Sequence, residues 1–484
     1  MKTTFSITKN ICGLAEVFLL LYVAENVIGS SGHLISFGSV SLRMLLFAAC
    51  FLLTNYFVFV RRRDLLKDQR IVLTILFAIW LVFCTLLGIK FKNQTNFIWS
   101  DLSSFLGLAL FPGFIVILES QRGIKKLIEV VFWAALVLSV VTIGIHLCIP
   151  IGGEKAICSI NTFLNSKSLG GLALLNSGMH RVYMRSQIFI QVAIIYGVWL
   201  IYNRNGKSRI TILICEGIML FALLLTYTRG FWLGFFISSV LLLLLELKNW
   251  NKLLAIAGIA LCVMGVFVGI STWVYNSPRV LTEAVSRISP DLLINHDVIN
   301  DVENDETIET EESTDLITDE ATGNTNKENL PEVSINQSAE EMTVTDIANL
   351  SALEIRSKTL EGLKERISDH PIIGNGLGSN LTEIREDGRT EYMYLDILFK
   401  TGTIGLILFL LVFFKSPIMI LMKCLKEKNE ISREDKLCAE VLVSSYIGVA
   451  VTSIFNPFLN NPMGITLLMI TSIGLILFKR SATK

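Results

Sequence analysis

The stretch IVLTILFAIWLVFCTLLGI, residues 71–89, contains no charged side chain. A bilayer core about 30 Å thick is crossed by about 20 apolar residues in a helix. This stretch is therefore predicted to span a membrane. Arg70 and Lys90 flank it and mark the two ends of the span.

Similar apolar stretches recur along the chain, separated by charged or polar breaks. Of its 484 residues, 52% are hydrophobic and only 17% are charged, which is the composition of a membrane protein and not of three soluble domains. We predict an all-α polytopic membrane protein with about twelve transmembrane helices. The predicted spans are residues 10–29, 40–60, 70–90, 102–119, 127–149, 186–202, 209–228, 231–247, 253–275, 395–414, 437–456 and 462–479.

Basic residues are distributed unevenly between alternate connections. The rich set contains Arg61, Arg62, Arg63, Lys67 and Arg70, then Arg122, Lys125 and Lys126, then Arg204, Lys207 and Arg209, then Lys248 and Lys252, then the stretch from Lys415 to Lys436, and finally Lys479, Arg480 and Lys484. The poor set contains Lys90, Lys92, Lys155, Lys167, Arg181, Arg185 and Arg229. The positive-inside rule then predicts that the rich set is cytoplasmic, with both termini inside and an even number of spans.

This topology divides the chain into three parts. Residues 1–275 hold spans one to nine, residues 276–394 form one large outer loop, and residues 395–484 hold spans ten to twelve. Within the loop, the acidic stretch 291–350 has a single lysine and no aromatic residue, which predicts disorder; a calcium site is the alternative. A capping-box pattern then predicts an outer helix over 352–368.

Several function classes are disfavoured by the sequence. The net charge is zero, with 42 basic against 42 acidic residues, so no nucleic-acid partner is expected. No P-loop, kinase motif or Cys/His ligand spacing is present, so we expect no nucleotide, cofactor or metal. The pairing of Cys148 with Cys158 stays open. A reaction would therefore use substrates supplied at the outer membrane face, and lipid-linked intermediates are the obvious supply.

Arginines near the outer ends of spans are candidates for binding phosphate, because the planar guanidinium suits bidentate contacts. Arg181 and Arg185 precede the sixth span and would share a helix face if that span begins early. Arg229 lies in a tight turn between the seventh and eighth spans. Arg356 and Arg366 lie on the predicted outer helix. The alternatives are interfacial snorkelling for Arg181 and Arg185, an ordinary turn arginine for Arg229, and a solvated helix face for the last two.

Two residues are candidates for proton transfer. Glu391 lies just before the tenth span, where partial desolvation would raise its basicity. His370 follows the outer helix and precedes Pro371. The alternatives are an ordinary interfacial acid for Glu391 and a helix cap for His370.

An ordered set of short motifs carries a family resemblance. They are Thr228-Arg229-Gly230, the Arg185 region, Asp369-His370-Pro371-Ile-Ile-Gly374-Asn-Gly376-Leu-Gly378, Glu391-Tyr-Met-Tyr394-Leu395 and Lys400-Thr-Gly402-Thr-Ile-Gly405. With the many spans and the one large outer loop, this order resembles the O-antigen polymerase and ligase superfamily, which comprises Wzy-type polymerases and lipid A core ligases. The resemblance covers most of the chain from about residue 180 to residue 410, as an ordered set of short motifs.

The resemblance implies an activity. Such a polymerase joins undecaprenyl-diphosphate-linked repeat units into O-antigen or capsule at the outer face of the bacterial cytoplasmic membrane, without metal or nucleotide. A chain-length regulator and a flippase are its expected partners, besides membrane lipid. Family ligases place a catalytic histidine where this chain has Glu391, which favours a polymerase. A ligase acting on lipid A core or protein is the first alternative, and a transporter is the second, although the matching halves of a transporter are not found.

Overall fold

The structure, a computed structural model, describes residues 2–30, 32–38, 40–61, 67–175, 178–288, 344–384, 390–426 and 431–478. Most of the predicted acidic stretch 291–350 therefore lies outside the described residues. Its last part, from 344, belongs to a helix that begins earlier than the predicted range 352–368. Val344, Ile347 and Leu350 are spaced three residues apart, so a helical pattern of apolar residues already precedes Ser351.

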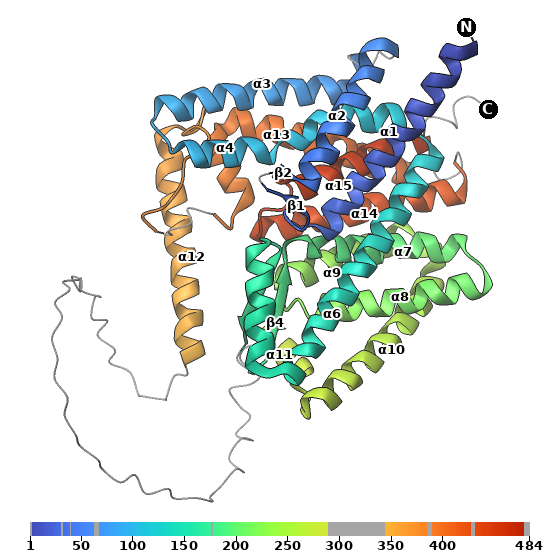
Figure 1. The fold of residues 1–484 in the computed structure, drawn as a ribbon, viewed down its shortest axis with the longest axis vertical. Coiled ribbons are helices and arrows are strands. Elements are labelled where there is room, and N and C mark those ends of the chain that lie inside the picture. The colour runs from blue at the N-terminus through green and yellow to red at the C-terminus, as the bar shows by residue number, and fades with distance from the viewer. Residues whose placement is uncertain are drawn as a thin grey trace, which may run out of the picture.

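The described chain is a bundle of helices (Figure 1). The helices are α1 (Lys2–Ile28), α2 (Leu42–Arg61), α3 (Gln69–Lys90), α4 (Thr95–Ser104), α5 (Phe111–Gly113), α6 (Gln121–Ser166), α7 (Ile188–Asn203), α8 (Gly206–Leu224), α9 (Arg229–Leu245), α10 (Trp250–Tyr275), α11 (Arg279–Ile288), α12 (Val344–Asp369), α13 (Met393–Lys426), α14 (Arg433–Phe455) and α15 (Pro462–Ile473). Short 3₁₀ or π segments lie at Leu106–Leu110, Phe114–Leu118, Arg185–Gln187, Leu247–Asn249 and Gly474–Phe478.

The protein is an α-helical membrane protein. Among the described residues, seven helical segments are long and apolar enough to cross a membrane: Gln69–Lys90, Thr95–Leu118, Gln121–Ser166, Arg185–Asn203, Trp250–Tyr275, Met393–Lys426 and Arg433–Phe455. Shorter apolar helices lie at Leu42–Tyr56, Arg229–Leu245 and Pro462–Phe478. Helical structure is present in each of the twelve ranges that the sequence predicts as spans.

In the described part of the chain, two short hairpins interrupt the helices. Strand β1 (Ser36–Phe37) pairs with β2 (Val40–Ser41), and β3 (Gly170–Leu174) pairs antiparallel with β4 (His180–Met184). The second hairpin corrects the prediction that Arg181 and Arg185 share a helix face. Arg181 lies in β4, because side chains there alternate, with Val182 and Met184 buried and Tyr183 exposed. The following helical segment begins only at Arg185.

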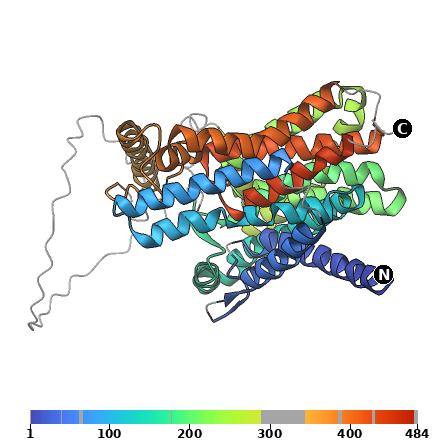
Figure 2. The same ribbon diagram turned by 90° about the horizontal axis from the view of Figure 1, so that it is seen from above.

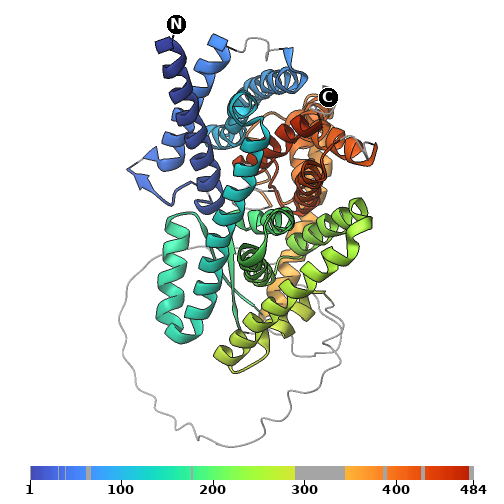
Figure 3. The same cartoon turned by 90° about the vertical axis from the view of Figure 1, so that its right-hand side faces the viewer.

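Helices α7 and α14 form the centre of the bundle. Nearly every side chain of α7 is buried, and Figure 3 shows α7 and α9 almost end-on between the other helices. Small residues allow α9 to approach α14: a Cβ atom on Gly234 would lie 2.5 Å from the carbonyl oxygen of Gly448. Close backbone approach through small residues is typical of helix packing in membranes.

The two sets of connections occupy opposite ends of the bundle. At one end, ion pairs and hydrogen bonds join Lys125 to Glu434, Arg204 to Glu129, Gln121 to Asp435 and Lys415 to Gln69. At the other end, contacts join Ser30 to Leu169, Arg181 to Thr228, Asn93 to Ser379 and Asp101 to Lys400. Figure 2 shows the start of α1 at one end and α12 at the other. The basic-rich connections are therefore separated in space from the basic-poor ones.

Cys148 and Cys158 are both free thiols, so the disulfide left open by the sequence is not formed. Both lie on α6, on either side of a kink at Gly153, where φ is 56°. Both side chains are exposed.

Candidate functional site at the end of the bundle that carries α12

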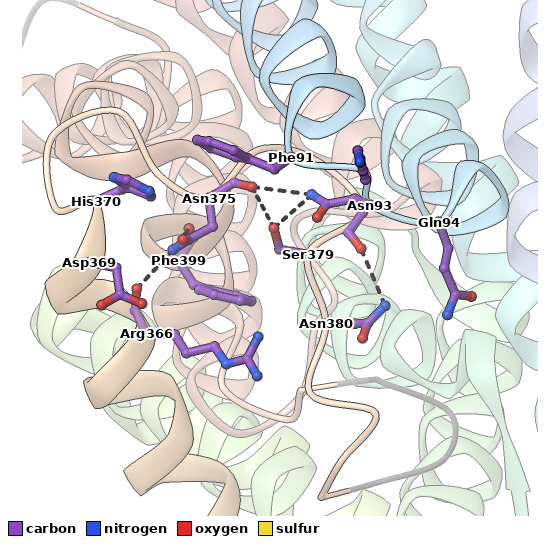
Figure 4. A pocket seen from close by; sticks show the side chains of 12 residues that line it. Phe91, Asn93, Gln94, Arg366, Asp369, His370, Asn375, Ser379, Asn380 and Phe399 are labelled. Carbon is purple, nitrogen blue, oxygen red and sulfur yellow. Dashed lines mark hydrogen bonds between the residues drawn. The ribbon is translucent and has the colours of Figure 1, made fainter.

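A pocket of about 360 Å³ lies where the end of α12 meets the turn between α3 and α4 (Figure 4). Three parts of the chain supply most of its wall: residues 91–94, residues 366–370 and residues 375–380. Phe399 of α13 lines the pocket as well. Most of these side chains are amides, hydroxyls or charged groups, so the pocket is a polar one.

Backbone conformation shapes the wall formed by the segment after Pro371. Gly374, Gly376 and Gly378 all have φ close to +80°, in the left-handed region that glycine adopts without a steric penalty. A Cβ atom on Gly376 would lie only 2.4 Å from the backbone nitrogen of Gly88. The segment can therefore lie directly against the end of α3.

His370 is a pocket residue, as Figure 4 shows. Its imidazole stacks on the ring of Phe91, with centroids 5.1 Å apart and ring planes only 5° from parallel. The cap role considered for His370 belongs to another side chain, because Asn375 donates from Nδ2 to the carbonyl oxygen of Arg366 near the end of α12, over 2.9 Å. The imidazole therefore contributes to the pocket surface.

Glu391 and Arg356, which the sequence assigned to different tasks, are brought together. Arg356 donates from Nε to Oε2 of Glu391 over 2.6 Å. The side chain of Glu391 is 33% exposed and that of Arg356 is 54% exposed, so this pair is accessible to water. Neither residue is among the described residues that line the pocket.

Arg366 lines the pocket and also binds an acid. Its Nη2 donates to both carboxylate oxygens of Glu383, each over 2.9 Å. Figure 4 shows the guanidinium turned toward the hollow below Phe399. A phosphate ligand at Arg366 would have to compete with Glu383.

A second basic group lies beside the β3–β4 hairpin. Arg181 donates from Nη2 to Oγ1 of Thr228 over 2.8 Å, and its guanidinium lies over the ring of Tyr183. Thr228 directly precedes Arg229, which is the exposed first residue of α9. The tertiary structure thus brings Arg181 to the turn that carries Arg229. Arg185 is exposed, one residue after the end of β4.

His180 neighbours this second basic group and adds no charge to it. Partial burial lowers the pKa of its imidazole below the usual value. At pH 7 the ring is therefore neutral, and the positive charge here comes from the arginines.

The sequence did not identify a partly buried ion-pair cluster beside the pocket. Nζ of Lys400 lies 2.9 Å from Oδ1 of Asp101 and 3.1 Å from Oδ2 of Asp396. A lysine inside a predicted span is costly and usually functional, which was the available signal for Lys400. Asp101 could not be assigned as its partner because 299 positions separate the two residues.

The described residues contain no group of three or more His, Cys, Asp or Glu side chains that could hold a metal ion. No protein-family model matches the chain, and a search of curated proteins finds no match either.

Proposed function

We propose that the protein polymerises undecaprenyl-diphosphate-linked oligosaccharide repeat units into surface polysaccharide, at the outer face of the bacterial cytoplasmic membrane. The proposal includes twelve spans, cytoplasmic termini and an outer position for residues 276–394. Its support is the spatial separation of basic-rich from basic-poor connections, together with the polar pocket at the basic-poor end.

The reaction is a displacement at an anomeric carbon. A sugar hydroxyl of one lipid-linked unit attacks C1 of the glycan carried by another, a new C–O bond forms, and the bond from C1 to the diphosphate oxygen breaks. The hydroxyl proton passes to a base, and undecaprenyl diphosphate leaves with the bonding electrons. The protein must supply that base and stabilise the charge of the departing diphosphate.

The observation that carries the proposal is the contact between Glu391 and Arg356, 2.6 Å from Oε2 to Nε. A carboxylate that accepts the hydroxyl proton and a guanidinium that binds phosphate are the two groups that this displacement needs. They lie side by side at the end of the bundle where lipid-linked sugars would be presented. Glu391 is the proposed base, and His370 is the reserve candidate.

The pocket supports a sugar-binding role. Sugar hydroxyls both donate and accept hydrogen bonds, and so do the amides and hydroxyls of Asn93, Gln94, Ser379 and Asn380 that line the pocket. The stacked rings of Phe91 and His370 add a flat apolar surface on which the C–H face of a sugar ring can pack.

The diphosphate is assigned to Arg181, Arg185 and Arg229, with Arg356 and Arg366 assisting. Arg229 is the first residue of α9, so the positive end of that helix dipole adds to its charge. The contact of Arg181 with Thr228 joins two of the arginines into one basic group. A chain-length regulator and a flippase are the proposed protein partners.

Reconstitution tests the proposal. The full-length protein in phospholipid vesicles is mixed with undecaprenyl-diphosphate-linked repeat units from the same bacterium, in the presence of a metal chelator. A ladder of glycans longer than one repeat is expected, with release of undecaprenyl diphosphate. Absence of a ladder, with the protein folded and the substrate accessible, would contradict the polymerase assignment. Transfer of one glycan to added lipid A core, without a ladder, would indicate a ligase instead.

A further inference from the structure

The segment Gly374–Asn380 is held by the end of α3 and by α4. The backbone N–H of Leu377 donates to the carbonyl oxygen of Cys84 over 3.0 Å. A Cβ atom on Gly88 would lie 2.2 Å from the carbonyl oxygen of Leu377. The backbone of this pocket wall therefore packs directly on the backbone of α3, and its position depends on that helix.

Asp101 of α4 holds the same segment through a charged contact. Its Oδ2 accepts the backbone N–H of Gly378 over 2.8 Å, and its Oδ1 accepts from Nζ of Lys400 over 2.9 Å. Lys400 is fixed in turn by Asp396 at 3.1 Å. Both carboxylate oxygens of Asp101 are thus engaged, one by the pocket wall and one by a cation on α13.

Asn93 holds neighbouring parts of the segment. Its Nδ2 lies within hydrogen-bond distance of the carbonyl oxygens of Asn375 and Leu377 and of Oγ of Ser379, at 3.2, 3.0 and 2.9 Å. Asn93 itself lines the pocket, as do Gly378, Ser379 and Asn380. Asp101 does not line this pocket, so its effect on a ligand there is exerted through the backbone of Gly378.

We propose that Asp101 is a positioning residue for the sugar-binding pocket: braced by Lys400, it sets the position of Gly378 and hence of Ser379 and Asn380 toward the bound repeat unit. This inference rests on the proposed function. A hydrogen bond to a charged group is shorter and stronger than a neutral one, which suits a group that fixes a loop. Because Asp101 acts at a distance from the reacting atoms, it should influence substrate binding and leave the chemical step nearly unchanged.

The test uses Asp101→Asn in the full-length protein. Asparagine has nearly the same shape but only one oxygen, so either Gly378 N–H or Lys400 must lose its acceptor and face an NH₂ group. In the reconstituted assay the KM for the lipid-linked repeat unit should rise about tenfold, the loss expected for one hydrogen bond to a charged group. The value of kcat should stay within about twofold of the wild-type value.

Asp68→Asn is the matched control. Asp68 also accepts a backbone N–H, that of Arg70 over 2.9 Å, and also binds a cation, the guanidinium of Arg70 at 2.7 Å. Its side chain is 22% exposed against 21% for Asp101. It lies at the opposite end of α3, so its replacement should leave KM unchanged.

Hydrogen exchange supplies a measurement that needs no activity. Amide exchange in a peptide covering residues 374–380 should accelerate about tenfold or more in Asp101→Asn and in Asp101→Ala, but not in Asp68→Asn. Unchanged exchange would show that Asp101 does not hold the segment. Faster exchange with an unchanged KM would show that the segment does not position the substrate. Loss of folded protein in both Asp101 variants would show that the ion pair of Asp101 with Lys400 is needed for folding and does not specifically position the pocket. That result would also overturn the inference. Absence of polymer from the wild-type protein would instead count against the proposed function.

Discussion

Arg356 of α12 and Glu391, two residues before α13, form an ion pair of 2.6 Å between Nε and Oε2. The pair ties α12 to the start of a helix that is long and apolar enough to cross the membrane. Both partners are partly exposed to water, so in the proposed reaction Arg356 would exchange Glu391 for a phosphate of the lipid-linked donor. The carboxylate would then be released at the moment when a base is needed.

The role of Glu391 is tested by Glu391→Gln, which is nearly isosteric but cannot accept the proton. General-base assistance is typically worth about 10² to 10⁴ in rate, so polymer should fall to single repeat units while the protein still folds and inserts. Glu391→His should keep partial activity, since imidazole can also accept a proton. Glu361→Gln, an exposed acid on α12, is the control and should behave as wild type. Normal polymer lengths from Glu391→Gln would move the test to His370→Ala.

The diphosphate assignment is tested by changing Arg185 and Arg229, singly, to lysine and to alanine. Lysine keeps the charge but loses the planar fork, so Arg→Lys should impair polymer formation almost as much as Arg→Ala. The measurement is the initial rate at saturating repeat unit, in membranes with equal amounts of protein. If both alanine variants make normal polymer, the assignment of these two residues is wrong.

The topology is tested by labelling introduced cysteines in intact cells, after Cys148, Cys158 and Cys262 have been replaced by serine. A cysteine at Glu361, exposed on α12, should react with an impermeant maleimide. A cysteine at Lys207, exposed at the start of α8, should react only after the membrane is opened. The reverse pattern would invert the orientation inferred from the basic residues.

The close approach of α3 to residues 374–380 predicts different effects on stability for two Gly→Ala substitutions. Gly88→Ala would bring a Cβ atom to 2.2 Å from the carbonyl oxygen of Leu377, so it should cost about 1–3 kcal/mol, as overpacking typically does. Gly258→Ala has nothing within 4 Å, so it should be neutral or stabilise α10 by up to about 1 kcal/mol. Thermal unfolding of the purified protein in detergent measures both. Equal melting temperatures for the two variants would show that Gly88 does not lie this close to the carbonyl oxygen of Leu377.

The sequence allowed the helical membrane class to be predicted, and seven long apolar helices confirm it at that level. The count of twelve spans stays a prediction. Two local predictions differ from the structure. His180–Met184 alternates like a strand but was interpreted as the approach to a helix, and the helix predicted from Ser351 begins at Val344.

The candidate site was predictable only as separate pieces. His370 and Arg366 both line the pocket, but the pocket itself depends on Phe91 and Asn93, which no motif indicated. The pairing of Glu391 with Arg356 could not be predicted either, because Glu391 was assigned to proton transfer and Arg356 to phosphate binding independently of each other. A carboxylate in a sequence does not reveal which cation will neutralise it.

The sequence by itself determined that this chain is a helical membrane protein, because transfer of apolar side chains from water to lipid is a local property of about 20 consecutive residues. It also separated basic-rich from basic-poor connections, since charge bias is again local. Only the tertiary structure decided that Asp101 binds Gly378 and Lys400. It also decided that Asn93 binds Ser379 in the segment 374–380, and that Arg181 binds Thr228. The reason is physical: these contacts join segments that approach one another only when helices pack, and packing depends on side chains from several helices at once.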